Sequence, residues 1–196
     1  MTDALIGIAG FAGAGKDTVA DLMVAHYGFD KIAFADTMRR MIEAIDPVVG
    51  YSPLEDGDFE VIRYNDAIEF VGYNDAKVMY PEIRQFLQRL GTEAGREVFG
   101  DNIWADMAMK RAATMKRVVI ADTRFRNEAE AIKANGGIVI RVTRPGVDAT
   151  NGHVSEHDLD GWRYDAHIHN NGTLSDLMVK AEAVFAKTIP GVLRIS

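Results

Sequence analysis

Cysteine is absent from the 196-residue sequence. Without a thiol, the chain cannot form a disulfide bond, bind a metal through thiolates or use a cysteine nucleophile. The absence fits a protein that works in a reducing interior, and we therefore expect a cytoplasmic location.

The sequence also has no excess of basic residues. Its 22 lysines and arginines against 29 aspartates and glutamates give a formal net charge of −7. A protein that coats nucleic acid is usually basic, so we expect no nucleic-acid partner. An anionic substrate must then be met by arginines that the fold places locally.

Long hydrophobic runs are missing as well. No apolar stretch approaches the roughly 20 residues that span a bilayer, and the first apolar segment follows Asp3 without the basic region of a cleavable leader. We therefore expect no membrane partner and no export signal. The hydrophobic share of 47% still permits a sizeable core, and we expect one domain over residues 1–196.

The most informative stretch lies near the start of the chain. An apolar segment at 5–9 ends in a loop with glycines at 10, 13 and 15, and a helical pattern from Lys16 to Tyr27 follows and stops at Gly28. This strand–loop–helix context is typical of a P-loop, whose amides bind phosphate at a helix N-terminus. Lys16 would reach the outer phosphates of a nucleoside triphosphate. The candidate ATP-binding residues here are Phe11, Ala12, Gly13, Ala14, Gly15, Lys16, Asp17 and Thr18.

This loop departs from the strict P-loop pattern at one position. The pattern has Ser or Thr directly after the lysine, where its hydroxyl helps to hold Mg²⁺, whereas this chain has Asp17 there and Thr18 next. Either residue could approach the metal, directly or through water. The Rossmann fingerprint is excluded, because its third glycine would fall on Thr18.

Four further short strands are predicted at 31–35, 117–122, 138–143 and 166–169, each followed by a helix or a helix-rich segment. Alternating strands and helices predict an α/β fold with a five-stranded parallel sheet and helices on both faces. A last helix is expected after the turn at 170–172, with Thr173 as its N-cap.

Carboxylates follow two of the predicted strands. Asp36 stands where the N-cap of a helix over 36–45 belongs, and it would also face the crevice in which parallel sheets bind ligands; the two interpretations are compatible. Asp122 ends a buried strand, as does the Walker B aspartate that holds Mg²⁺ or its water.

Between these strands lies a helix-rich region. Residues 48–57 suggest a loop, 59–71 a helix, and Pro81 begins a better helix whose predicted buried face includes Ile83, Leu90, Ala94 and Val98. Polar residues recur every four positions beside that face, which is typical either of a solvated surface or of a binding ridge. They are Arg84, Gln88, Thr92 and Arg96.

Two glycines in this helix, Gly91 and Gly95, weaken it by roughly 1 kcal/mol each relative to alanine, which suggests a close approach there. We expect Trp104 by default to be an aromatic residue of the hydrophobic core. Between 147 and 163 the chain is polar. His153 and His157 could suggest zinc, but no other ligand is in evident reach, and a mobile polar lid is the better interpretation.

Several of these segments occur in one order, and together they resemble the deoxynucleoside monophosphate kinases of tailed bacteriophages, within the wider P-loop nucleoside monophosphate kinase group. The segments are residues 10–18, 34–36 with Arg39, the series Arg84, Gln88, Gly91, Thr92, Arg96 and Trp104, then 122–128, Arg144 with Pro145, and 171–173. The P-loop is shared with many families, whereas residues 122–128 and the arginine-bearing helix are more specific. The resemblance is weakest across 48–80 and 147–165.

The resemblance implies a three-layer α/β/α P-loop kinase fold with strand order 2-3-1-4-5. It implies a helical acceptor-binding insertion at about 46–115 and a lid at about 145–165. The family suggests a homodimer to which residues 48–80 would contribute, and a phage-encoded chain would act in the cytoplasm of the infected bacterial host.

The implied reaction transfers the γ-phosphoryl group of ATP to the 5′-phosphate of a deoxynucleoside monophosphate, giving the diphosphate for DNA synthesis. Such a transfer depends on positioning and charge neutralisation. Lys16, Arg124 and Asp122 are the implied catalytic residues. Mg²⁺ would lie near Thr18, Asp17 or Asp122.

The implied binding residues fall into two groups. On the ATP side, Arg144 would stack on adenine beside Asn171. On the acceptor side, arginines would meet the phosphate, Gln88 and Thr92 would read the base or sugar, and Glu156 would belong to the lid. The acceptor candidates are Asp36, Arg39, Arg84, Gln88, Thr92, Arg96, Trp104, Arg124 and Glu156.

Two rival functions remain open. A P-loop kinase of another phosphorylated molecule, such as dephospho-coenzyme A or phosphomevalonate, would share the loop, although the helix carrying Arg84 and Arg96 argues against it. A regulatory module that hydrolyses ATP slowly would need a water-positioning residue and a large partner surface, and neither is evident in the sequence.

Overall fold

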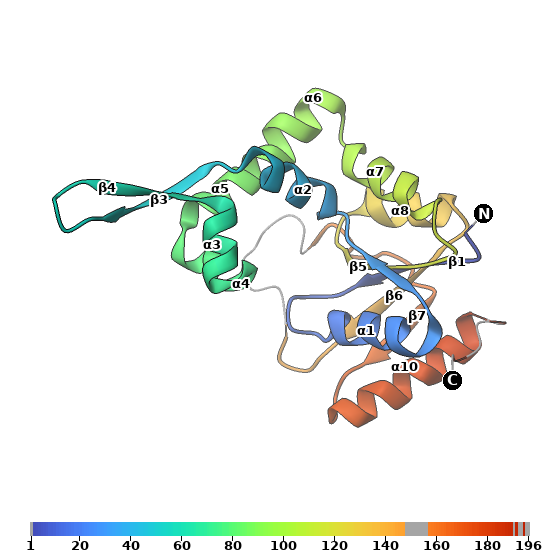
Figure 1. The fold of residues 1–196 in the computed structure, drawn as a ribbon. Helices are drawn as coiled ribbons and strands as arrows, with labels where there is room; N and C mark the ends of the chain where they lie inside the picture. Colours follow the sequence, from blue (N-terminus) through green and yellow to red (C-terminus); the bar gives the residue numbers. More distant parts are fainter. Residues whose placement is uncertain (1, 148–156, 190, 192–193, 195–196) are drawn as a thin grey trace. The chain divides into compact units, whose positions relative to one another are not determined.

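The computed structural model describes residues 2–147, 157–189, 191 and 194 (Figure 1). It divides into two compact units. The core unit consists of Met1–Phe34 and Ala105–Ser196, and the inserted unit is Ala35–Trp104. The resemblance implies an acceptor-binding insertion at about 46–115, and the acceptor-binding role of this segment stays a prediction. The expectation of a single domain over residues 1–196 stays a prediction as well.

The core unit is built on a five-stranded sheet in which all neighbouring strands are parallel. Its strands are β1 (Ala4–Ala9), β2 (Asp30–Ile32), β5 (Arg117–Thr123), β6 (Ile138–Thr143) and β7 (Ala166–His169). They lie in the order β2-β5-β1-β6-β7. Counting only these five strands along the chain, the order is 2-3-1-4-5, so the predicted sheet and its order are confirmed.

Helices cover both faces of this sheet (Figure 1). On one face, α1 (Lys16–Tyr27) and α10 (Leu174–Thr188) share an apolar cluster with Ile6, Ile8 and Val119. On the other face, Ala105, Ala108 and Met109 of α7 (Ile103–Ala112) and Ile132 of α8 (Arg126–Ala134) join a second cluster. Because the sheet is covered on both faces, all six residues of β1 are buried. The three-layer α/β/α architecture is confirmed.

The predicted bounds of three elements, 16–27, 138–143 and 166–169, are confirmed. The strand expected at 31–35 is wrong at both ends, since β2 spans Asp30–Ile32. Its early end has a physical cause. The backbone N–H of Phe34 donates to Asp122 Oδ1 at 2.8 Å, so the carboxylate, and not a neighbouring strand, takes this donor.

A β-bulge interrupts the pairing of β1 with β5 where the site begins. Gly7 pairs with Ile120 but Ala9 pairs with Thr123, so β5 contains one extra residue over this step. A bulge changes the direction of the side chains that follow it and is common next to active sites. Here it sets the directions of Asp122 and Thr123.

The inserted unit combines a hairpin with helices around its own apolar cluster, which includes Ile42, Tyr64 and Ile83. Its elements are α2 (Asp36–Ile45), β3 (Val48–Pro53), β4 (Phe59–Arg63), α3 (Tyr64–Val71), α4 (Tyr73–Met79), α5 (Pro81–Arg89), the π-helix η1 (Leu90–Arg96) and α6 (Glu97–Phe99). The loop predicted at 48–57 is wrong over 48–53 and the helix predicted at 59–71 is wrong over 59–63, because β3 and β4 pair there as an antiparallel hairpin. The helical prediction is confirmed over 64–71 by α3. Asp36 is the first residue of α2 and not its N-cap, which is Ala35.

The π-helix explains why the predicted buried face fails beyond Leu90. A π-helix bonds residue i to i+5, so the buried side moves on by five residues and not by four. Leu90 and Gly95 are buried, whereas the predicted Ala94 and Val98 are exposed. Gly95 has to be glycine, because a Cβ there would lie 2.3 Å from Cζ2 of Trp104.

Within the described ranges, no helix combines the length and the apolar character that crossing a membrane requires. The same residues contain no cluster of three or more acidic or histidine side chains arranged for a metal ion. His153, one of the two histidines of the zinc alternative, lies outside the described residues.

Candidate functional site

The glycine-rich loop between β1 and α1 has the backbone that its sequence predicts. Gly10, Gly13 and Gly15 have φ values of 143°, 79° and 103°, a region that residues with a Cβ rarely adopt. A Cβ on Gly10 would lie 2.2 Å from the carbonyl oxygen of Val142. The loop can therefore rest directly on β6 while it leads into the N-terminus of α1, where backbone N–H groups bind anions.

Lys16 is the buried cation of this loop, with 7% of its surface exposed. Its Nζ donates a hydrogen bond to the carbonyl oxygen of Phe11 at 2.8 Å. Burial lowers the pKa of Lys16 and nearby Arg124 lowers it further, while Asp17 and Asp122 act in the opposite direction. The loop lysine and three of the predicted site residues are thus close enough to act on one another electrostatically.

Asp17 and Thr18, the two candidates for the metal, lie in different surroundings. The carboxylate of Asp17 is largely exposed and accepts from Nζ of Lys31 at 2.9 Å, and Lys31 also reaches Asp21 at 2.9 Å. Thr18 is half-buried in the first turn of α1. In this structure Oδ1 of the Asp17 carboxylate binds the ammonium group of Lys31, and which of the two residues approaches the metal stays a prediction.

Asn170 anchors the loop and was not singled out from the sequence. It is buried, its side-chain Nδ2 donates to the carbonyl oxygen of Ala14 at 2.9 Å, and its backbone N–H donates to Thr143 at 2.7 Å. Asn171, the residue predicted to bind ATP, is exposed, and its side-chain oxygen accepts a hydrogen bond from Lys180. An asparagine directly after the last predicted strand is the sequence signal that could have pointed to Asn170.

The turn after β5 holds Arg124 next to Asp122. The buried carboxylate of Glu128 accepts from the backbone N–H groups of Arg124 and Phe125, at 2.8 and 3.0 Å. This bond pattern fixes the turn at the start of α8 and leaves the Arg124 side chain exposed to the site. Glu128 is thus a supporting residue for a predicted catalytic one.

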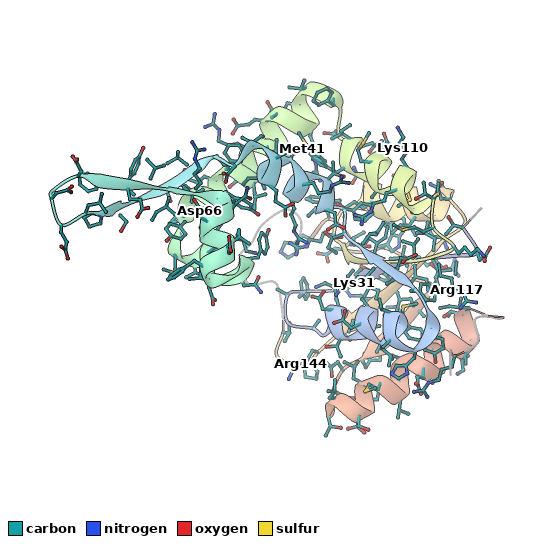
Figure 2. All side chains as sticks on the ribbon, viewed as in Figure 1. Lys31, Met41, Asp66, Lys110, Arg117 and Arg144 are labelled. Carbon is teal, nitrogen blue, oxygen red and sulfur yellow. The ribbon has the colours of Figure 1, made fainter. Side chains whose placement is uncertain are left out.

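A depression beside the loop gathers several of these groups. The residues around it that carry the argument are Phe11, Lys16, Arg124, Arg141, Asp160 and Tyr164. The sequence analysis did not identify Arg141 or Tyr164. A single arginine within a run of apolar strand residues, as at Arg141, gives no motif. Arg144, predicted to stack on adenine, is exposed on the loop after β6 and is not part of this lining (Figure 2).

In the inserted unit, the predicted polar ridge lies on the surface. Arg84, Gln88 and Thr92 are exposed, and Arg96 is half-buried in the π-helix. Trp104 is buried at 5% exposure and its Nε1 donates to the carbonyl oxygen of Gly91 at 2.8 Å. The close approach that Gly91 and Gly95 suggested is therefore made by protein side chains, Met38 at Gly91 and Trp104 at Gly95.

Cations of the inserted unit gather around Tyr73. Arg39 lies 5.0 Å from the ring centre and Lys77 lies 4.2 Å from it. Arg84 is tied to the same place, because its Nε donates to the carbonyl oxygen of Lys77 at 3.0 Å. Arg39 also contacts Asp36 at 3.5 Å. Two predicted acceptor residues, Arg39 and Arg84, thus form one cationic group with Lys77, which was not predicted.

The segment predicted to be a lid, at about 145–165, includes residues 148–156, which lie outside the described residues. Glu156, the predicted acceptor-side residue, lies outside the described residues. His157 contacts Asp160 at 3.0 Å, and residues 157–161 form a helical turn that places Leu159 in the core.

A glycine-rich anion cradle with a buried lysine, at the carboxyl end of the central strand of a parallel sheet, defines a P-loop nucleotide-binding protein. Comparison with known proteins narrows the class. A sequence model of the deoxynucleotide monophosphate kinase family matches residues 54–181. The chain therefore belongs to the deoxynucleotide monophosphate kinase family.

Individual proteins that carry the name of this family are also similar to the chain. A putative deoxynucleotide monophosphate kinase of Acanthamoeba polyphaga mimivirus is 29% identical over 185 residues, covering 88% of this chain and 91% of its own. The deoxynucleotide monophosphate kinase of Escherichia phage RB69 is 31% identical, covering 69% of this chain and 54% of its own. The deoxynucleotide monophosphate kinase of Enterobacteria phage T4 is 24% identical, covering 90% of this chain and 96% of its own. A gluconokinase structure from Sinorhizobium meliloti 1021 overlaps with 94% of this chain and 93% of its own, with a TM-score of 0.45 at 16% sequence identity. This similarity is too low to bear on function.

Proposed function

We propose that this chain transfers the γ-phosphoryl group of ATP to the 5′-phosphate of a deoxynucleoside monophosphate. An oxygen of the acceptor phosphate forms a bond to the γ-phosphorus, the bond from that phosphorus to the β,γ-bridging oxygen breaks, and ADP leaves. The products are ADP and a deoxynucleoside diphosphate. The observation that carries the proposal is the buried Lys16 in a loop whose glycines have positive φ values, within a chain whose sequence matches a kinase family.

The reaction needs little covalent chemistry from the protein, so the residues act by position and charge. The loop amides and Lys16 bind the phosphates of ATP, and Arg124 stabilises the charge of the group in transfer. The turn held by Glu128 keeps Arg124 beside Asp122. Two polyanions repel each other, and each of these cations reduces that repulsion.

The oxygen ligands beside Lys16 fit Mg²⁺. Mg²⁺ is usually bound by one or two carboxylates together with substrate phosphates, so the lack of a larger acidic cluster among the described residues is no obstacle. Asp122 and the hydroxyl of Thr18 would hold the ion, directly or through water, whereas Asp17 is engaged by Lys31. When bound, the ion neutralises charge on the β- and γ-phosphates.

The inserted unit supplies the acceptor site in this proposal. Arg84 and Arg96 bind the acceptor phosphate, Arg39 assists, and Gln88 and Thr92 contact the base or sugar. The cationic group around Tyr73 supports this role, because an array of Arg39, Lys77 and Arg84 attracts a phosphate. Asp36 orients Arg39 through their contact.

The test is an ADP-release assay with Mg-ATP against dGMP, dTMP, dCMP, dAMP, their ribonucleotide counterparts, dephospho-coenzyme A and phosphomevalonate. We expect rapid turnover with one or more deoxynucleotides. Turnover only with a non-nucleotide acceptor would overturn the acceptor assignment while keeping the loop. Slow ADP release that is the same with every acceptor would indicate a regulatory ATPase and refute the proposal.

A further inference from the structure

Arg141 is a charged residue in the middle of an apolar strand. Its neighbours in β6, Ile140 and Val142, are fully buried, whereas Arg141 is half-buried and lines the depression beside the phosphate loop. In the register of the sheet it lies opposite Ala9, the last residue of β1 before the loop. The strand thus brings this guanidinium to the level of the loop.

Two aromatic rings hold the guanidinium in place. It lies 5.8 Å from the ring centre of Phe11, a loop residue, and 5.2 Å from that of Tyr164. A long hydrogen bond of 3.5 Å runs from its Nη1 to the hydroxyl of Tyr164, which itself donates to the carbonyl oxygen of Leu159 at 3.3 Å. Aromatic faces orient an arginine but do not neutralise it.

The charges around the depression are mainly positive. Lys16 and Arg124 line it together with Arg141, and Asp160 is the acidic residue of the lining. Among the described parts of the chain, no carboxylate forms an ion pair with Arg141. Three cations that face one half-enclosed space repel each other, and an anion with several oxygens would relieve that repulsion.

We propose that Arg141 binds the phosphate chain of ATP at its γ-phosphoryl end, as a third cation beside Lys16 and Arg124, and that Tyr164 positions it. The planar fork of an arginine fits two phosphate oxygens, which suits a residue fixed between two rings. The inference rests on the proposed function insofar as ATP is the phosphoryl donor. It assigns a phosphate-binding role to a residue outside every P-loop motif.

The test compares nucleotides that differ only in their phosphates. The dissociation constants of Mg-ATP, ADP and AMP are measured by calorimetry for the full chain and for Arg141→Gln. We expect ATP binding to weaken roughly tenfold to a hundredfold, because charge-assisted hydrogen bonds are lost. AMP binding is expected to change less than about twofold. Arg141→Lys should recover part of the ATP affinity, since it restores the charge without the fork.

Arg117→Gln is the matched control. This arginine begins β5, at the opposite end of the parallel sheet from Arg144 (Figure 2), and its Nη1 donates to the carbonyl oxygen of Tyr27 at 2.8 Å. We expect it to bind ATP and AMP as the unmodified chain does. Circular dichroism melts of all variants show whether each one is folded.

Tyr164→Phe tests the positioning role. We expect it to weaken ATP binding by roughly twofold to fivefold, and to cause no further loss when it is added to Arg141→Gln. If Arg141→Gln lowers the melting temperature but leaves the ratio of ATP to AMP affinity unchanged, Arg141 is a structural brace and the inference is wrong. If ATP affinity depends on Arg141 while no deoxynucleotide is phosphorylated, the inference stands and the proposed function fails.

Discussion

The side chain of Asn170 donates a hydrogen bond to the carbonyl oxygen of Ala14 at 2.9 Å, and so joins the end of β7 to a phosphate loop 156 residues earlier. Asn170 is 8% exposed and Ala14 is 1% exposed, so water cannot easily replace this bond. A Cβ on Gly15 would lie 2.8 Å from the same Nδ2, which shows how closely Asn170 and the loop pack. The last strand of the sheet therefore helps to set the shape of the loop.

Asn170→Ala should weaken both the fold and ATP binding. The substitution leaves the buried carbonyl oxygen of Ala14 without this donor, which costs about 1–3 kcal/mol of unfolding free energy. Urea unfolding and ATP titration measure the two effects. Asn135→Ala is the control, because the exposed Asn135 also donates to a backbone carbonyl, that of Ala131 at 2.8 Å. Equal losses in the two variants would contradict a special role of Asn170.

Lys16→Ala should abolish phosphoryl transfer and leave the chain folded. The loop amides remain, but the buried cation that reaches the outer phosphates is lost, and kcat is expected to fall by at least roughly a hundredfold. The ADP-release assay and a circular dichroism spectrum give the two readouts. Lys110→Ala on α7, an exposed lysine (Figure 2), should retain activity. Near-normal turnover of the Lys16 variant would remove the basis for the P-loop assignment.

Arg84→Ala and Arg96→Ala should each raise the KM for the acceptor or lower kcat, with little change in ATP binding. Losing a charge-assisted contact to a phosphate costs about 1.5–3 kcal/mol, or roughly tenfold to a hundredfold in kcat/KM. Steady-state kinetics with acceptor and ATP varied in turn separate the two substrates. Arg89→Ala is the control from α5, the helix that carries Arg84, since Arg89 is exposed and pairs with Glu93 at 3.3 Å. A loss confined to ATP affinity would move the acceptor site elsewhere.

Tyr64 should make the fold sensitive to alkaline pH. Burial, together with Tyr73 and Glu43, raises the pKa of Tyr64 from 10.0 to about 12. Between these pKa values the unfolded chain has released the phenol proton and the folded chain has kept it, so stability falls as pH rises through this window. Unfolding free energy measured from pH 9 to 12 should therefore fall less steeply in Tyr64→Phe. An unchanged slope in that variant would show that Tyr64 does not titrate as described.

The sequence predicted the core unit better than the inserted unit, for physical reasons. Parallel strands that are buried on both faces are continuous apolar runs, and the glycines and Lys16 of the loop form a spaced motif. The hairpin of β3 and β4 gives no such signal. Tyr51 and Phe59 are 67% and 66% exposed, so the hydrophobic pattern of the hairpin does not reflect burial, and the sequence predicts a helix from residue 59 where the structure has β4.

Sequence reasoning missed Arg141 and Asn170, because the pairing of the strands, and not a local motif, brings them to the site. Arg141 reaches the loop because β6 aligns it with Ala9, and Asn170 reaches Ala14 because β7 ends at the same edge of the sheet. Neither alignment can be derived from local sequence. The π-helix is a similar case, because the five-residue spacing of Leu90 and Gly95 depends on how Trp104 packs against Gly95.

The central claim is that the γ-phosphoryl group passes from ATP to a deoxynucleoside monophosphate. The most direct measurement follows ATP labelled at the γ-phosphate and identifies the labelled product by chromatography, with each deoxynucleoside monophosphate in turn. The account predicts a labelled deoxynucleoside diphosphate formed in equal amount to ADP, and none with Lys16→Ala. Label recovered only as inorganic phosphate, whichever acceptor is present, would contradict it.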